Sequence, residues 1–203
     1  MSYTIALAGN PNCGKTTLFN DLTGSRQRVG NWPGVTVDKK EGIYKKDKEI
    51  GIMDLPGTYS LSPYSAEEII ARDYIVKEKP DAVIDIVDGT SIERNLYLTL
   101  QILETGVPTV IALNMMDEVE ARGDKIGAEK LSEIFGVPVV PIVARNGKGI
   151  QELMAEAVEV AKGKKTPKKL SIFDEKLQGA IDEAKKLLED AGESDSEWKA
   201  IKL

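Results

Sequence analysis

The residues best suited to chemistry stand near the start of the chain, at positions 9–16. Their sequence, GNPNCGKT, fits the pattern G-x-x-x-x-G-K-[ST] of loops that hold nucleotide phosphates. Gly9 and Gly14 allow the backbone to turn so that successive N–H groups converge on an anion. Lys15 can place an ammonium group beside phosphate oxygens, and Thr16 can offer its hydroxyl to Mg²⁺. We therefore predict a site for a nucleotide with its magnesium ion.

The segments on either side of this loop are those that such a site needs. Residues 3–8 form a short apolar run typical of a buried strand, and residues 17–22 indicate the start of a helix. A helix N-terminus stabilises negative charge, so this order of strand, loop and helix favours bound phosphates. We expect the nucleotide to contact the whole loop, namely Gly9, Asn10, Pro11, Asn12, Cys13, Gly14, Lys15, Thr16 and Thr17.

A second motif, DLPG at residues 54–57, follows a predicted strand at residues 48–53. Asp54 can hold Mg²⁺ through a water molecule, and the Gly57 N–H can contact a terminal phosphate. Such a tetrapeptide by itself is most often an ordinary turn. Its place after a phosphate loop and a strand hairpin predicts a loop that senses whether the terminal phosphate is present.

A third motif, NMMD at residues 114–117, follows the apolar run at residues 110–113. Asp117 can accept two hydrogen bonds from the N1–H and the exocyclic amine of guanine, and adenine lacks this pair of donors. A buried carboxylate without partners is costly, so sites of this kind discriminate by about 10⁴–10⁵. We expect Asn114 to tie the base loop to the phosphate loop. The alternative for the tetrapeptide is a hydrogen-bonded turn after a strand.

The composition excludes several classes of function. The chain of 203 residues has no histidine and a single cysteine, Cys13, which excludes an imidazole base, a histidine-rich metal site and a disulfide within the chain. The net charge of −6 argues against nucleic acid as a partner. No apolar run approaches the length that spans a membrane, and the single cysteine fits a reducing compartment.

Predicted strands and helices alternate along the chain, which indicates an α/β fold with a mostly parallel sheet and helices on both faces. The six predicted strands are residues 3–8, 35–44, 48–53, 81–88, 107–113 and 137–143. The predicted helices after the first are residues 65–77, 91–105, 127–135 and 150–161. The hairpin after residue 34 should add one antiparallel edge strand. Ser65 and Glu68 are spaced as a capping box, and the ligand should lie at the C-terminal ends of the strands.

We divide the chain into a nucleotide-binding domain at residues 1–163, a linker at residues 164–169 and a helical segment at residues 170–203. The lysine-rich linker fits a solvated connection better than a polybasic membrane-binding run. An apolar stripe at helical spacing then needs a partner surface. It consists of Phe173, Leu177, Ile181, Ala184 and Leu188. A second apolar face begins at Trp198 and stays incomplete, so we expect the chain to be a piece of a longer protein.

In this order and spacing, the motifs resemble those of the Ras-like superfamily of P-loop GTPases (the TRAFAC class), over residues 1–163. The resemblance implies that Thr36 is the switch threonine, whose hydroxyl joins Thr16 and Asp54 around Mg²⁺. Met115 replaces the lysine of the N-K-x-D motif and could cover the base with its aliphatic chain. The S-A-K position reads Val143, Ala144 and Arg145, and its usual role is a backbone N–H that contacts the guanine oxygen.

Three longer stretches are similar to the FeoB family of bacterial and archaeal ferrous-iron transporters. They are residues 30–37 (GNWPGVTV), residues 54–65 (DLPGTYSLSPYS) and residues 71–74 (ARDY). The resemblance implies a cytosolic GTPase followed by a small helical domain and a membrane domain, at the cytoplasmic face of the inner membrane. It implies GTP and GDP as ligands. The implied partners are the membrane domain of the same polypeptide, small accessory transport proteins and further copies of the chain.

The same resemblance extends the site to the loop before Thr36. It implies that Asn12 helps to hold K⁺ beside the phosphates, with carbonyl groups of Gly30 and Trp32, and that Trp32 covers the nucleotide. For Asn12 the alternative is a residue suited to the turn, and for Trp32 an exposed loop aromatic. The nucleotide contacts expected here are Trp32, Gly34, Val35 and Thr36. The residues expected to act in hydrolysis are Asn12, Lys15, Thr36 and Gly57.

We therefore expect a slow GTPase, stimulated by K⁺, that acts as the switch of a ferrous-iron transporter. Many switch GTPases place a glutamine directly after D-x-x-G, and this chain has Thr58 there. Two alternatives stay open: a soluble GTPase that acts on RNA or ribosomes, and a GTP-dependent interaction module with negligible turnover.

Overall fold

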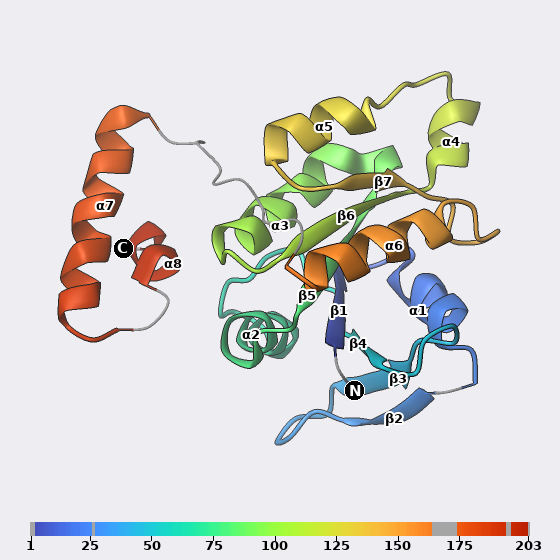
Figure 1. Cartoon of the computed structure of the whole chain (residues 1–203), viewed down its shortest axis with the longest axis horizontal. Helices are drawn as coiled ribbons and strands as arrows, with labels where there is room; N and C mark the ends of the chain where they lie inside the picture. Colours follow the sequence, from blue (N-terminus) through green and yellow to red (C-terminus); the bar gives the residue numbers. More distant parts are fainter. Residues whose placement is uncertain (1–2, 26, 164–173, 194–195, 203) are drawn as a thin grey trace.

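The computed structural model describes residues 3–25, 27–163, 174–193 and 196–202, which form a seven-stranded sheet with helices on both faces and two C-terminal helices beside it (Figure 1). The strands are β1 (Tyr3–Gly9), β2 (Gln27–Asn31), β3 (Asp38–Ile43), β4 (Ile50–Asp54), β5 (Ala82–Asp88), β6 (Thr109–Asn114) and β7 (Val139–Pro141). The helices are α1 (Lys15–Thr23), α2 (Ala66–Asp73), α3 (Ile92–Glu104), α4 (Met116–Ala121), α5 (Ala128–Phe135), α6 (Ile150–Ala161), α7 (Glu175–Asp190) and α8 (Ser196–Ile201). A π-helical turn, η1 (Tyr74–Glu78), continues α2, and a 3₁₀ turn, η2 (Gly89–Ser91), precedes α3.

The sheet has the order β2-β3-β4-β1-β5-β6-β7. β3 is antiparallel to both of its neighbours, and the other strand pairs are parallel. Leu7 pairs with Asp54 on one side of β1, and Gly9 pairs with Ile86 on the other. The phosphate loop therefore leaves the sheet between the ends of two parallel strands, and the predicted α/β class with helices on both faces is confirmed.

The number of strands differs from the prediction, seven instead of six. The additional strand is β2, which lies in a segment where no strand was predicted. It pairs with β3 from Gln27 opposite Gly42 to Asn31 opposite Asp38. All five of its residues are exposed, so it lacks the apolar alternation that marks a half-buried strand. β3 in turn begins at Asp38, which leaves Thr36 in the loop that precedes it.

Two layers of apolar side chains hold the helices to the sheet. On one face Phe19 and Leu22 of α1 and Leu153 of α6 pack against the central strands with no exposed surface. On the other face Leu98 and Ile102 of α3 pack against the sheet and are at most 1% exposed. Complete burial of one such side chain contributes roughly 1.5–3 kcal/mol, so these layers fix the strand ends that carry the site.

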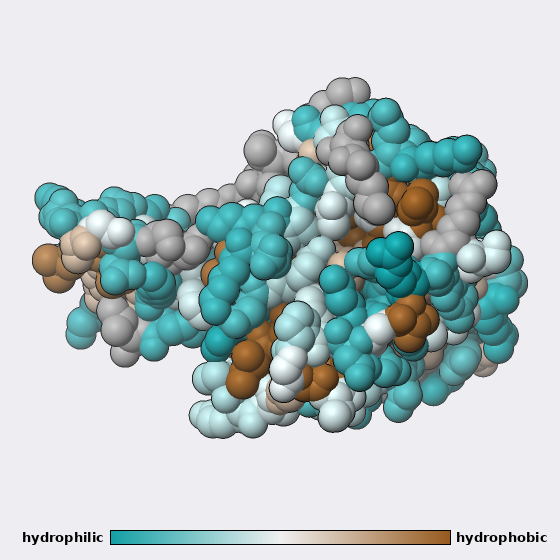
Figure 2. Space-filling view, turned by 90° about the horizontal axis from the view of Figure 1, so that it is seen from below, coloured by the Kyte–Doolittle hydropathy of each residue, from teal (hydrophilic) through white to brown (hydrophobic). Residues whose placement is uncertain are grey.

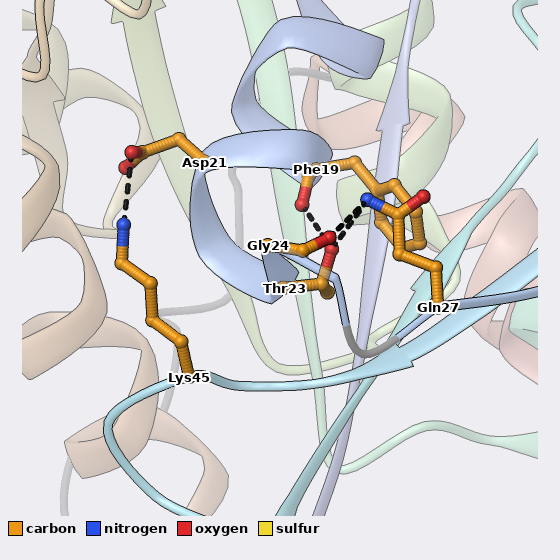
Figure 3. A network of polar contacts seen from close by, with 6 residues as sticks. All are labelled: Phe19, Asp21, Thr23, Gly24, Gln27 and Lys45. Carbon is orange, nitrogen blue, oxygen red and sulfur yellow. Dashed lines mark hydrogen bonds and ion pairs between the residues drawn. The ribbon is translucent and has the colours of Figure 1, made fainter.

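A polar network fastens the C-terminal end of α1 to the hairpin (Figure 3). The Gln27 side chain donates hydrogen bonds to the Gly24 carbonyl oxygen (2.9 Å) and to the Thr23 hydroxyl (3.0 Å). Lys45, which follows β3, forms an ion pair of 2.9 Å with Asp21 of α1. The exposed strand β2 is thereby anchored at its start, although its side chains contribute little to the core.

Figure 2, seen from below, shows a mainly hydrophilic face with small separate apolar patches.

In the helical segment, the burial of the side chains follows the predicted apolar stripe in part. Ile181 of α7 is buried and Ala184 and Leu188 are half-buried, whereas Leu177 is 48% exposed. Lys202, directly after α8, forms an ion pair of 2.8 Å with Glu104 of α3. Trp198 of α8 also lines a small cavity that is shared with η1. The predicted linker at residues 164–169 and Phe173 lie outside the described residues. None of the helices described here combines the length and the apolar character needed to cross a lipid bilayer.

Candidate nucleotide site

The phosphate loop has the backbone that the sequence predicts. Gly9 and Gly14 have φ angles of +153° and +94°, and Asn12 lies in the left-handed region at +66°. A side chain at Gly9 would lie 2.6 Å from the Ile86 carbonyl oxygen, and one at Gly14 would collide with the Asn114 amide. The loop therefore requires glycine at both positions because the neighbouring strands pass close beside it.

The N-terminus of α1 is prepared for an anion. Its N-cap, Gly14, provides no side-chain hydrogen bond, and its first turn holds no acidic residue. The free N–H groups of that turn and the positive end of the helix dipole are therefore left for a ligand. Lys15 stands at the same place, 9% exposed, with its Nζ 2.6 Å from Oδ1 of Asp54, itself 5% exposed.

Lys15 and Asp54 open onto a cavity of about 420 Å³ at the C-terminal ends of β1 and β4. The predicted residues that line it are Lys15, Thr16, Thr36, Asp54 and Gly57. Two hydroxyls and the Asp54 carboxylate thus face one space, which Asp38 and Glu67 also line. These oxygen donors fit Mg²⁺, which takes one or two protein carboxylates and completes its shell with phosphates and water. Among the described residues no group of three or more His, Cys, Asp or Glu could hold a metal ion without such help.

The loop after Asp54 packs against the phosphate loop. A side chain at Gly57 would lie 3.2 Å from Cα of Pro11, so the two backbones are in contact there. The Thr58 N–H donates a hydrogen bond of 3.3 Å to the Gly9 carbonyl oxygen. The Thr58 hydroxyl, buried at 4% exposure, donates to the Ser60 carbonyl oxygen at 2.5 Å. Thr58 therefore uses its hydroxyl within the loop, as expected of a residue that does not replace the missing glutamine.

Asn114 joins three loops, as the sequence predicts. Its Nδ2 donates to the Cys13 carbonyl oxygen at 2.8 Å, and its Oδ1 accepts the Ala144 N–H at 2.9 Å. The second bond directs the Ala144 N–H to Asn114 in this structure, and the backbone contact of residues 143–145 with the guanine oxygen stays a prediction. Met115 adopts the left-handed conformation, with φ +63°, and turns the chain into α4.

Asp117 lies in the first turn of α4, a helix that the sequence analysis missed because its apolar pattern is too short. Its side chain is 25% exposed, and its Oδ2 forms an ion pair with Nη2 of Arg145. Arg145 follows Val143 and Ala144 in the loop after β7, so the structure brings the two predicted base-contacting segments together. The carboxylate is held in place by a cation from the segment that resembles S-A-K.

The segment before Thr36 makes contacts that the sequence analysis did not predict, and its expected contacts with the nucleotide stay predictions. Trp32 packs edge-on against Tyr74 of η1, with ring centroids 5.7 Å apart, and Lys39 Nζ lies 5.3 Å from the Trp32 ring. The ring is therefore directed to the α2 side of the sheet and does not cover the phosphate loop in this structure. Gly30, within β2, Gly34 and Val35 are also absent from the residues that line the 420 Å³ cavity. Among the residues of this segment that were predicted to contact the nucleotide or its ions, Thr36 is the one that lines the cavity.

Two buried groups have pKa values shifted by burial: Asp85, which the sequence analysis did not single out, and Cys13 of the phosphate loop. Asp85 of β5 is 1% exposed and accepts a hydrogen bond of 2.6 Å from the Thr99 hydroxyl. Burial raises its pKa to about 7, and the Thr99 hydrogen bond opposes this shift. The sequence does contain a signal that could have pointed to this site, namely an acidic residue within the apolar run of residues 82–87. Burial also raises the pKa of the Cys13 thiol to about 12, although the backbone N–H groups near Lys15 oppose that effect.

Comparison with known proteins places this geometry in a family. The family model described as "Ferrous iron transport protein B" matches residues 3–157. The chain belongs to this family. The Fe(2+) transporter FeoB of Escherichia coli K12 is 53% identical over 155 residues, which are 74% of this chain and 20% of that protein. A Porphyromonas gingivalis fusion of Fe(2+) transport protein A with FeoB is 52% identical over 162 residues, 79% of this chain and 19% of that protein.

The chain spans about a fifth of the length of these two relatives. Solved FeoB domains match nearly all of it. A mutant of S. thermophilus NFeoB bound to mGDP has a TM-score of 0.94 and 45% identity, with 100% of this chain and 78% of that chain covered. Another S. thermophilus mutant, bound to GDP·AlF₄⁻, has a TM-score of 0.86 and 46% identity and covers 98% and 78%. The match extends through α7 and α8, so the FeoB fold includes the helical segment.

Proposed function

We propose that this chain is the cytosolic G domain of a ferrous-iron transporter, which binds GTP and GDP with Mg²⁺ and hydrolyses GTP. The observation that supports this most directly is the Asn114 linkage, which holds the base loop and the phosphate loop at a fixed separation. Asp117 then marks the guanine end, and Lys15, Thr16, Thr36 and Asp54 mark the triphosphate end. The GDP and GDP·AlF₄⁻ complexes of the S. thermophilus relative support the same assignment.

Hydrolysis by these residues would depend on position and charge. Bound Mg²⁺ would neutralise phosphate charge. The Lys15 ammonium group would give up its ion pair with Asp54 and would stabilise the terminal phosphate instead. The Gly57 N–H would contact that phosphate. Because the Thr58 hydroxyl is directed to Ser60, backbone groups would have to orient the attacking water. Turnover is therefore expected to be slow.

The proposed K⁺ site centres on Asn12. Its backbone lies in the left-handed region, a conformation that also suits a residue chosen for the turn. Carbonyl groups of Gly30 and Trp32 would complete the site, which requires the segment before Thr36 to move toward the phosphate loop. Asn12→Ala should abolish any difference between GTP hydrolysis in K⁺ and in Na⁺. Equal rates of the unaltered chain in the two salts would remove the K⁺ proposal and leave the GTPase proposal intact.

In the whole protein this domain would act at the cytoplasmic face of the inner membrane, coupled to the membrane domain of the same polypeptide. Accessory transport proteins and further copies of the chain are the other proposed partners. Calorimetry with GTP, GDP and ATP in Mg²⁺ tests the central proposal. Tight binding of both guanine nucleotides with no detectable ATP binding is expected, and equal affinity for ATP would overturn it.

The other candidate is an interaction module that binds GTP with negligible turnover. The observation in its favour is the Thr58 hydroxyl, which is bound within its own loop. Phosphate release at saturating GTP in K⁺ distinguishes the two candidates, because only the GTPase produces phosphate over many turnovers.

A further inference from the structure

Helix α3 contacts the loop after Asp54 at two points. The Gln101 side chain, 8% exposed, accepts a hydrogen bond of 2.6 Å from the Leu61 N–H. Nearer the nucleotide site, the guanidinium carbon of Arg94 lies 5.5 Å from the centroid of the Tyr59 ring. This distance is within the range of a cation–π interaction. Tyr59 follows Gly57 by two residues, so this second contact acts on the part of the loop that carries the phosphate-sensing N–H.

Arg94 itself is held in a fixed place. Its carbonyl oxygen accepts a hydrogen bond of 3.5 Å from Nδ2 of Asn10, a phosphate-loop residue that is 2% exposed. The next residue, Asn95, accepts the Asp88 N–H at 3.3 Å and donates to the Ser91 carbonyl oxygen at 2.9 Å. The first turn of α3 is thereby fixed to the end of β5 and to the phosphate loop.

The loop carrying Gly57 is therefore contacted from two sides. On one side Gly57 lies against Pro11, and Thr58 donates to the Gly9 carbonyl oxygen. On the other side the Arg94 guanidinium covers the Tyr59 ring, which remains 48% exposed. Arg94 is absent from the residues that line the 420 Å³ cavity, and the contact of its guanidinium group that reaches the loop with Gly57 is the one with Tyr59.

We infer that Arg94 is a positioning residue for GTP hydrolysis: through Tyr59 it holds the Gly57 N–H where the terminal phosphate is bound. This inference rests on the proposed function. GDP lacks the terminal phosphate, so loss of the contact lowers affinity for GTP and leaves affinity for GDP unchanged. A cation–π contact at an exposed site corresponds to a change of about two- to five-fold in such an affinity.

The test compares Arg94→Ala, Arg94→Lys, Tyr59→Leu and Tyr59→Phe by calorimetry with GDP and a non-hydrolysable GTP analogue, and by phosphate release. Arg94→Ala and Tyr59→Leu are expected to lower the ratio of GTP to GDP affinity and the turnover number by about two- to five-fold each. Arg94→Lys keeps the cation and Tyr59→Phe keeps the ring, so both variants should retain most of the affinity ratio and most of the turnover number. The double variant Arg94→Ala/Tyr59→Leu should lose no more than one single variant. Tyr97→Leu is the matched control, because Tyr97 is an exposed tyrosine of the same helix.

An unchanged ratio in Arg94→Ala would overturn the inference, as would additive losses in the double variant or equal losses for GTP and GDP. Equal losses would show a general structural role, and thermal unfolding of Arg94→Lys and Arg94→Ala would reveal it. Failure of the unaltered chain to bind or hydrolyse GTP would overturn the proposed function itself. Normal turnover of the unaltered chain with an unaffected Arg94→Ala variant would overturn this inference alone.

Discussion

The side-chain amide of Asn114 donates a hydrogen bond of 2.8 Å to the carbonyl oxygen of Cys13, a residue 101 positions earlier in the chain. Its amide oxygen accepts the Ala144 N–H at 2.9 Å. Asn114 is 3% exposed, so water does not compete for these bonds. One side chain therefore sets the spacing between the phosphate loop and both loops expected to contact the base.

Replacement of Asn114 by alanine should weaken this spacing. It leaves the Cys13 carbonyl and the Ala144 N–H buried without partners, and each unsatisfied group costs about 1–3 kcal/mol. We expect a lower unfolding temperature and at least a tenfold loss of GDP affinity, measured by calorimetric scanning and titration. Asn114→Asp is the matched variant, since it keeps the acceptor for Ala144 and loses the donor to Cys13. Unchanged affinity in Asn114→Ala would contradict the assigned role.

Asp117→Asn should alter the choice of base. The carboxylate would accept hydrogen bonds from two guanine donors, whereas an amide presents one acceptor and one donor group. We expect GTP affinity to fall by several orders of magnitude, as in sites that discriminate through paired hydrogen bonds. Xanthine offers a carbonyl oxygen in place of the guanine amine, so xanthosine triphosphate should bind the variant better than GTP does. Calorimetry with both nucleotides measures the exchange, and retained GTP affinity would show that Asp117 does not contact the base.

Arg145 forms an ion pair with the Asp117 carboxylate. Its removal therefore shows whether Arg145 competes with guanine for that carboxylate or supports the bound nucleotide. If Arg145 competes with guanine for Asp117, Arg145→Ala should slow GDP release several-fold, as measured with a fluorescent GDP derivative. The cause is the loss of a competing cation at a carboxylate whose side chain is 25% exposed. Faster release would indicate that Arg145 instead supports the bound nucleotide. Arg122→Ala is a suitable control because Arg122 contacts the Thr90 carbonyl oxygen and not Asp117.

Stability should depend on pH through Asp85. Burial raises the pKa of its carboxyl group in the folded chain to about 7 from an ordinary value of 3.8. Between these pH values the unfolded chain ionises while the folded chain keeps the proton, so stability falls as pH rises from about 4 to about 7. Above that range both states are ionised and the loss is constant, at most about 4 kcal/mol. Asp85→Asn, which can still accept the Thr99 hydrogen bond, should remove this dependence. Denaturant unfolding of both proteins between pH 4 and 8 measures it, and parallel curves would contradict the assignment.

Cys13 should be inert in the folded protein. Its side chain is 1% exposed and burial raises the pKa of its thiol to about 12, so almost no reactive thiolate forms at neutral pH. A thiol reagent such as iodoacetamide should modify the native chain at least a hundred times more slowly than the chain in denaturant. Rapid modification of the native protein would show that the phosphate loop opens. A reaction that GDP slows would link this opening to nucleotide release.

Much of the site could be predicted because its motifs are local. The turn at Gly9 and Gly14, the cation of Lys15 and the hydroxyl of Thr16 occupy neighbouring positions, and their chemistry follows from residue type and spacing. The capping box of Ser65 and Glu68 is confirmed for the same reason, with the Glu68 N–H 3.1 Å from the Ser65 hydroxyl. β2 and α4 were missed because one is exposed on every residue and the other is only six residues long.

The sequence by itself determined the α/β class and the phosphate loop and predicted the groups that face the nucleotide, because strand and helix periods and short motifs are properties of neighbouring residues. The tertiary structure decided which distant residues meet. It placed Asn114 on Cys13, directed the Trp32 ring to Tyr74 and set Arg94 over Tyr59. Such contacts depend on strand order and on the packing of helices against the sheet, and no local pattern in the chain records the distance between residues that folding brings together.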